Sequence, residues 1–148
     1  HVGGLVGNSF GGVILNSYAT GSVTGGANAL VGGLVGINTD NFSQSYPIVS
    51  SSYSTGLVTG GQNATVGGLL GSDVADAHST HAYWDMDTSG ISDPSKGAGN
   101  IANDPGITGL TDAQLKSALP AGFDRKVWKQ NAAINNGYPY LIDNPPPR

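Results

Sequence analysis

The hexapeptide VGGLVG at residues 31–36 decides the fold, because the chain repeats it. VGGLVG also stands at residues 2–7 and VGGLLG at residues 66–71, so the copies begin 29 and 35 residues apart. A motif that returns at such a period is the signature of a repeat protein, in which each unit is one small structural element and neighbouring units stack. The sequence therefore predicts three structural repeats.

A second block keeps step with the hexapeptide and aligns three tyrosines. The segments NSYATGSVTGG, SSYSTGLVTGG and the degenerate HAYWDMDTSG place Tyr18, Tyr53 and Tyr83 at equivalent positions, 35 and 30 residues apart. The unequal spacings locate an insertion, INTDNFSQSYPIVS at residues 37–50, in the second repeat. We expect this insertion to be a loop that projects from the repeats.

Within each repeat, short apolar pieces end at glycine pairs. Pieces of this length are too short for helices and are typical of strands separated by turns. The composition agrees, since the chain has 24 Gly, only 11% charged residues and no Glu. A short strand unit cannot bury its apolar face alone, so stacking must supply the core. We therefore predict an all-β fold, a right-handed parallel β-solenoid (β-helix) of about three rungs, with the handedness that parallel crossovers prefer.

Stacking in register places equivalent residues in ladders. We expect the leucines at the fourth hexapeptide position to form an interior ladder and the fifth position to form the alternate face, because successive side chains of a strand point in opposite directions. The aligned tyrosines would form an aromatic stack. The interior ladder is Leu5, Leu34 and Leu69, and the alternate-face ladder is Val6, Val35 and Leu70.

The repeat pattern stops after Gly90. Residues 1–90 are thus predicted to be solenoid repeats, and residues 91–148 a loop over 91–109 and a C-terminal cap; the repeat boundaries are 1–30, 31–65 and 66–90. The segment LTDAQLKSALPAG carries a capping box, Thr111 with Gln114, which predicts one short helix of about two turns. We expect this helix and the aromatic tail after it to cover the last open rung.

Charge and hydropathy exclude several kinds of partner. Ten acids and six bases give a net charge of −4 without a basic cluster, which argues against nucleic acid and anionic membranes. The longest apolar runs fall far short of the roughly 18–20 residues that span a bilayer, so we expect no membrane insertion. The first rung has no N-terminal cap, and its unpaired strand edges predict either a longer solenoid or a homodimer formed through that rung.

The pattern VGGLVG…SYATGSVTGG over residues 2–90 is similar to the GLUG repeats of secreted bacterial proteins, among them filamentous-haemagglutinin-like two-partner-secretion adhesins and immunoglobulin A peptidases. YWDMDTSG, GLTDAQLKSAL, VW and GYPYL resemble the segment that follows the last GLUG unit in such proteins. The resemblance implies a secreted or surface-exposed β-solenoid stalk and no catalytic residue. In the peptidases the chemistry belongs to a separate zinc domain, whose HExxH motif this chain lacks.

The densest polar cluster of the sequence is DVADAHSTHAYWDMD at residues 73–87. His78 and His81 are three residues apart, which places them on opposite faces of a strand, so we expect no metal site from the cluster Asp73, Asp76, His78, His81, Asp85 and Asp87. Asp85 and Asp87 are a better pair, because residues i and i+2 of a strand point the same way about 6.5–7 Å apart. That spacing suits the two carboxylates of a glycosidase.

Two functions follow from these patterns. The first is a non-catalytic structural or adhesive module at the bacterial cell surface or outside the cell, which binds a glycan or receptor through residues 37–50 and 73–96. The alternative is a small carbohydrate-active enzyme, a glycoside hydrolase or polysaccharide lyase, with Asp85 and Asp87 catalytic and Tyr83 and Trp84 stacking on sugar. No cofactor is expected, although Asp85 and Asp87 could bind calcium with nearby carbonyls. Asp85 also aligns with Thr20 and Thr55, on an otherwise neutral polar ladder.

Overall fold

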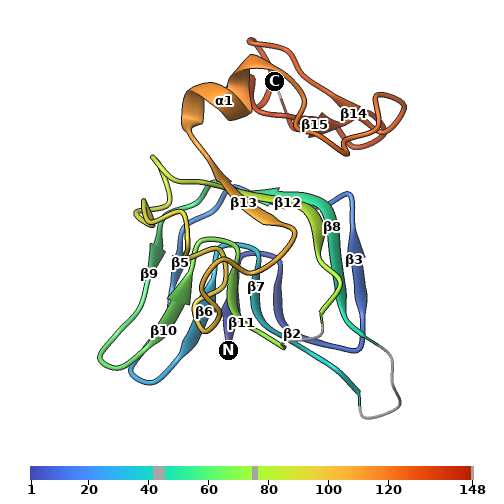
Figure 1. Cartoon of the computed structure of the whole chain (residues 1–148). Coiled ribbons are helices and arrows are strands. Elements are labelled where there is room, and N and C mark those ends of the chain that lie inside the picture. The colour runs from blue at the N-terminus through green and yellow to red at the C-terminus, as the bar shows by residue number, and fades with distance from the viewer. Residues whose placement is uncertain (42–45, 75–76, 148) are drawn as a thin grey trace.

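The computed structural model describes residues 1–41, 46–74 and 77–147. Each repeat contributes a set of short strands, and a non-repeated segment follows (Figure 1). The first repeat holds β1 (Val2–Gly3), β2 (Val6–Phe10), β3 (Val13–Leu15), β4 (Tyr18–Ala19) and β5 (Val23–Thr24). The second holds β6 (Leu30–Gly32), β7 (Val35–Thr39), β8 (Ile48–Ser54) and β9 (Val58–Thr59), and the third β10 (Thr65–Gly67), β11 (Leu70–Asp73) and β12 (Thr80–Asp85). After them come β13 (Ile107–Leu110), α1 (Asp112–Ser117), β14 (Trp128–Lys129), the 3-10 turn η1 (Asn135–Gly137) and β15 (Tyr140–Leu141).

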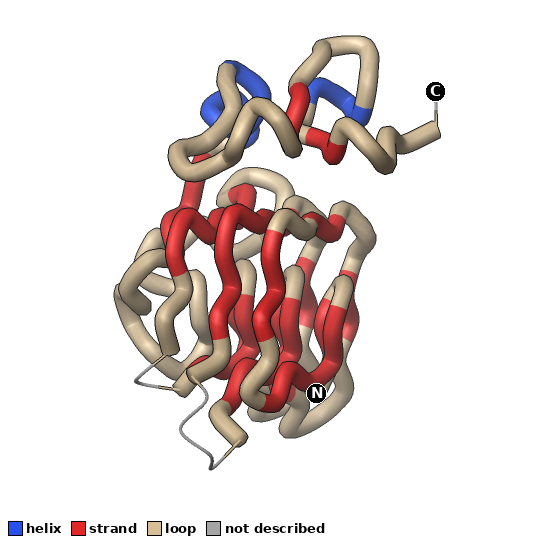
Figure 2. The backbone as a smooth tube through the Cα atoms, turned by 90° about the vertical axis from the view of Figure 1, so that its right-hand side faces the viewer, coloured by secondary structure: helices blue, strands red, loops and turns tan. Residues whose placement is uncertain are grey.

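Equivalent strands of successive repeats pair in parallel, in the register that the sequence repeat predicts. Val31 on β6 pairs with Val2 and with Val66, and Tyr53 on β8 pairs with Tyr18 and with Tyr83. Figure 2 shows the strands of the repeats lying side by side. The prediction of an all-β fold with parallel sheets and one short helix is therefore confirmed.

The aliphatic core lies between the sheets, and it corrects two expectations about the ladders. Leu34 and Leu69 are fully buried, but so are Val35 and Leu70, which were expected on the alternate face. The backbone bends at the hexapeptide, where the N–H groups of Leu34 and Val35 both donate to the carbonyl of Leu69, 2.9 and 3.1 Å away. This bend breaks the alternation, so both side chains point inward.

Leu5 was expected inside and is instead 49% exposed. The reason is that the first repeat supplies an edge strand to every sheet of the stack: β1, β2, β3 and β5. Large apolar side chains of that repeat are accordingly open to solvent, and they are Leu5, Phe10, Val13 and Leu15.

The glycine pairs of the hexapeptide are required by close backbone packing. A Cβ on Gly32 would lie 2.0 Å from the carbonyl oxygen of Val35 and 2.4 Å from the amide nitrogen of Gly71, both backbone atoms. Gly67 has equally tight backbone neighbours one repeat later. Because backbone cannot move aside as a side chain can, only glycine fits where neighbouring repeats turn the same corner.

Parallel pairing continues beyond the last recognisable repeat. Ala98 is fully buried and bridges Leu70, and β13 pairs in parallel with β12. The predicted loop over 91–109 is therefore wrong at its end, because residues 107–109 belong to β13. KGAGN at residues 96–100 packs against the third hexapeptide without copying it, and this segment, rather than the cap, covers the last repeat.

The cap, residues 111–147, lies across one side of the stack instead of over its end (Figures 1 and 2). α1 begins as predicted, with both hydrogen bonds of the Thr111–Gln114 capping box present. The cap packs on the outward-facing tyrosines, whose hydrophobic faces need cover. Of the three tyrosines expected to stack, Tyr18 and Tyr53 do so, with ring centres 5.3 Å apart, whereas the ring of Tyr83 packs on Phe123 at 5.8 Å. The rings of the repeats and of the cap meet in one buried cluster, which we call the aromatic cluster beneath the cap. It consists of Tyr53 and Tyr83 from the repeats and of Leu115, Phe123, Trp128 and Tyr138 from the cap.

Candidate functional site

Polar groups of all three repeats fasten the cap to the tyrosine face. From the first repeat, Asn16 accepts a hydrogen bond from the indole N–H of Trp128, 3.2 Å away. Tyr53 donates to the carbonyl of Pro139 (2.5 Å) and Tyr83 to that of Ala121 (3.0 Å). Burial raises the pKa of both tyrosines, so they stay protonated and act as donors.

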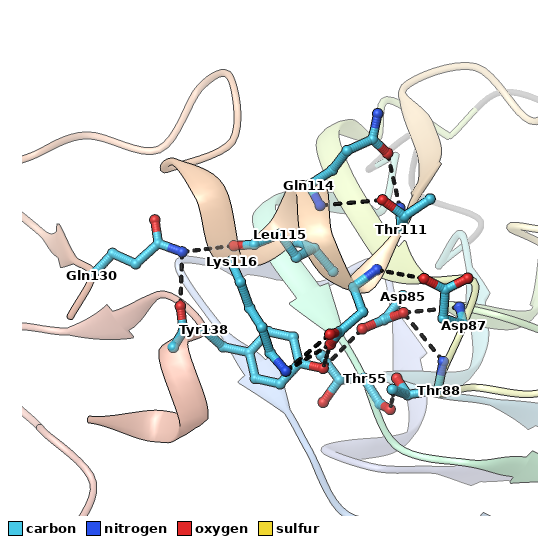
Figure 3. Close-up of polar contacts among 12 residues, drawn as sticks. Thr55, Asp85, Asp87, Thr88, Thr111, Gln114, Leu115, Lys116, Gln130 and Tyr138 are labelled. Atoms are coloured by element: carbon cyan, nitrogen blue, oxygen red, sulfur yellow. Dashed lines mark hydrogen bonds and ion pairs between the residues drawn. The ribbon is translucent and has the colours of Figure 1, made fainter. Parts of the chain in front are cut away.

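Asp85, the last residue of β12, is fully buried and has hydrogen bonds at both carboxylate oxygens (Figure 3). Oδ1 accepts the backbone N–H groups of Asp87 (2.9 Å) and Thr88 (3.2 Å) and so shapes the turn after the strand. Oδ2 accepts the hydroxyl of Tyr138, 2.9 Å away in the cap. Asp85 therefore joins the third repeat to the cap.

The hydroxyl of Tyr138 also contacts the carboxylate of Asp112 on α1, so one hydrogen lies between two carboxylates. Burial raises the pKa of Tyr138, and hydrogen bonding to Asp112 and Asp85 raises it further. The same hydroxyl lowers the pKa of Asp112 by stabilising its charged form. Lys116 completes the network, with its Nζ 2.9 Å from Asp112 and 4.5 Å from the centre of the Tyr138 ring.

The two carboxylates of the enzyme hypothesis do not share a strand face, and each accepts hydrogen bonds from within the chain. β12 ends at Asp85, so Asp87 lies in the following turn, where it is exposed and accepts the backbone N–H of Asp112 (2.9 Å). Trp84 is fully buried in the aliphatic core and donates to the carbonyl of Ile91, and Tyr83 is 8% exposed beneath the cap. Neither ring offers a face to a sugar, and the buried carboxylate is engaged within the chain.

The polar residues of the sequence segment 73–87 lie in different surroundings among the described residues. Asp76 lies outside the described residues; His78 packs edge-on against Tyr46, with ring centres 5.0 Å apart, and His81 is exposed. Among residues 1–41, 46–74 and 77–147, no three His or Asp side chains are placed to hold a metal ion together. The two loops expected to bind a ligand, 37–50 and 73–96, each include residues outside the described ranges.

A groove of about 460 Å³ lies between the cap and the threonine positions of the first two repeats. Thr20 and Thr55 occupy the ladder position that Asp85 takes in the third repeat, and the facing wall comes from the cap. The side chains around the groove are uncharged: Thr20, Thr55, Ala133, Asn135, Asn136, Tyr138, Pro146 and Pro147. Alignment of the three repeats with each other predicted the threonine ladder. The cap residues opposite it belong to no repeat, so their position could not be predicted in this way.

Comparison with known proteins supports the repeat and adds no activity. The model of the GLUG motif matches residues 1–24, so the first repeat carries this motif, as the sequence resemblance indicated. No curated protein and no solved structure matches the chain. The part of the chain that the structure describes contains no helix of the length and apolarity needed to cross a membrane.

Proposed function

We propose that this chain is a non-catalytic binding module of a secreted or surface-exposed bacterial protein, in which β-solenoid rungs and the cap together hold a neutral glycan. The observation that carries the proposal is the groove between the cap and the Thr20–Thr55 ladder. The GLUG motif at residues 1–24 supports the bacterial, extracellular setting.

The chemistry of the groove suits sugar hydroxyls. Threonine hydroxyls and asparagine amides can each donate and accept hydrogen bonds, as each sugar hydroxyl also does. A volume of about 460 Å³ is within the range of small-ligand sites, roughly 300–1,000 Å³. With no charged side chain in the wall, a neutral ligand loses less hydration than a charged one would.

Hydrogen bonds within the chain hold residues on both walls of the groove in place. The amide nitrogen of Asn135 donates to the hydroxyl of Tyr53 (3.1 Å) and to the carbonyl of Pro139 (2.9 Å). The hydroxyl of Thr88 donates to the carbonyl of Thr55 (2.7 Å), which ties the second repeat to the third. A preformed wall reduces the entropy lost on binding.

A glycan array probed with the full chain, followed by calorimetric titration of the best ligand, tests the proposal. Thr20→Val keeps the shape of the side chain and removes its hydroxyl, so we expect roughly tenfold weaker binding. Thr24→Val is the matched control, because Thr24 is also exposed, belongs to the same repeat and does not line the groove. Absence of any glycan ligand, or equal loss of affinity in both variants, would overturn the proposal.

A further inference from the structure

Three buried polar residues form a ladder across the sheet β2–β7–β11. Ser9, Asn38 and Asp73 pair in register, one from each repeat, and all three are buried. The amide nitrogen of Asn38 donates to Oδ1 of Asp73 at 3.0 Å. The ladder thus leads from a hydroxyl and an amide to a buried carboxyl group at the third repeat.

The Asp73 carboxyl is fixed in position from several sides. Oδ1 also accepts the backbone N–H of Val74 (2.9 Å). Asn100 binds the backbone of Asp73 twice, with its Oδ1 accepting the N–H and its Nδ2 donating to the carbonyl, both at 2.8 Å. These contacts leave Oδ2 of Asp73 buried without a hydrogen-bond partner among the described residues.

A second buried carboxyl, Asp104, lies within hydrogen-bonding reach of the Asp73 carboxyl, and no Lys or Arg of the described residues forms an ion pair with either. Its Oδ2 is also buried and lacks a partner among the described residues. Burial, and then the neighbouring Asp104, raise the pKa of Asp73 to about 7. Lys96 is the only Lys or Arg before residue 111, and its Nζ reaches the carbonyl of Gly99. Two facing carboxyls in this setting need either a proton or a cation between them.

Two buried oxygens on neutral side chains also lack a hydrogen-bond partner among the described residues. Oδ1 of Asn38, on a fully buried side chain bonded to Asp73, has no partner among the described residues, and neither does Oγ of the buried Ser79. Ser79 lies next to Gly106, two residues after Asp104, since a Cβ on Gly106 would lie 1.8 Å from the Ser79 carbonyl oxygen. All four unpartnered atoms are oxygens, the donor type that Ca²⁺ takes from carboxylate, amide and hydroxyl groups.

We propose that Asp73 and Asp104, assisted by Asn38, form a calcium site buried between the third repeat and residues 96–110, which follow it. Asp73 ends β11 and Asp104 precedes β13, so one ion would bind the last repeat to its covering layer. The site is distinct from the Asp85–Asp87 pair, whose carboxylates accept hydrogen bonds within the chain.

Thermal unfolding of the full chain at pH 8, with CaCl₂ or with NaCl of equal ionic strength, tests the site. A ligand at a hundredfold excess over its Kd raises the Tm of a domain of this size by about 5–10 °C. We expect this rise in the wild type and in Asp87→Asn, the control that removes an exposed carboxylate. We expect Asp104→Asn to lose it, because that variant removes one charged ligand.

Two results would overturn the proposal. The first is CaCl₂ without effect on the Tm of the wild type; a higher Tm for Asp104→Asn would then assign a shared proton to the pair. An equal rise in all three proteins would place calcium elsewhere. Should Asp104→Asn not fold, the carboxyl ¹³C shifts of the wild type decide: calcium must move those of Asp73 and Asp104 and leave that of Asp93, in an exposed turn, unchanged.

Discussion

The molecule has two interiors that are built differently: the aliphatic core inside the repeats and the aromatic cluster beneath the cap. In the first, a buried residue packs on its own equivalent one repeat away, as Leu34 does on Leu69. In the second, contacts are made once, between residues far apart in the chain. Tyr138 reaches Asp85 across 53 residues and Trp128 reaches Asn16 across 112.

Because of this difference, we expect substitutions in the two regions to destabilise the protein in different ways. The repeat core depends on close backbone packing at every corner, so damage at one corner affects the whole stack. The cap depends on a few large rings and polar anchors, so it can detach while the strands remain. Three changes, in order of expected effect, test this contrast.

The largest effect is expected from Gly32→Ala, which acts on the repeat core. Its Cβ would meet backbone atoms at 2.0 and 2.4 Å, so neighbouring repeats must separate. We expect destabilisation of about 3 kcal/mol or more, measured by chemical denaturation. Gly21→Ala is the control, because its Cβ would have nothing within 4 Å. Similar stability of the two variants would contradict the account of the glycine pairs.

Trp128→Ala should remove the cap and spare the repeats. The side chain is 1% exposed and contacts the rings of Tyr18, Tyr53 and Phe123. Such truncations cost about 3–5 kcal/mol, and here the loss falls on the cap interface. We expect loss of the near-ultraviolet circular dichroism and rapid proteolysis after residue 111, with the far-ultraviolet strand signal retained. Ile142→Ala, at a half-exposed cap position, should leave all three unchanged.

Acid should weaken the cap by a smaller amount through Asp112. The hydroxyl of Tyr138 lowers the pKa of this carboxyl below its ordinary value of 3.8. A depressed pKa stabilises the fold above the unfolded value, and this stabilisation is lost as the pH falls through the folded value. Between pH 5 and pH 2.5 the Tm of the wild type should therefore fall more than that of Asp112→Asn. If the Tm of the two proteins falls equally over this pH range, the Asp112 carboxylate does not stabilise the attachment of the cap.

The repeated region could be predicted from the sequence, because equivalent residues of successive repeats are neighbours in the structure. The alignment of Val2 with Val31 and of Tyr53 with Tyr83 therefore also gives the register of their strands. It could not predict the bend that turns Val35 inward, since alternation is a property of straight strands.

The candidate site was beyond the same reasoning. The groove pairs Thr20 and Thr55 with cap residues that have no counterpart elsewhere in the chain, so no internal comparison exposes it. The Asp73–Asp104 pair joins a repeat to a segment outside the pattern. Asp87 lies two residues beyond the end of β12, so Asp85 and Asp87 do not share a strand face.

The path of the cap across the stack has a mechanical consequence. When a stack of repeats is pulled from one end, the repeats can unfold one after another, each at low force. Here the cap is fastened to the first repeat at Asn16, to the second at Tyr53 and to the third at Tyr83. Tension applied beyond the cap is thus shared by three repeats at once, and the cap must shear off before any strand can be drawn out.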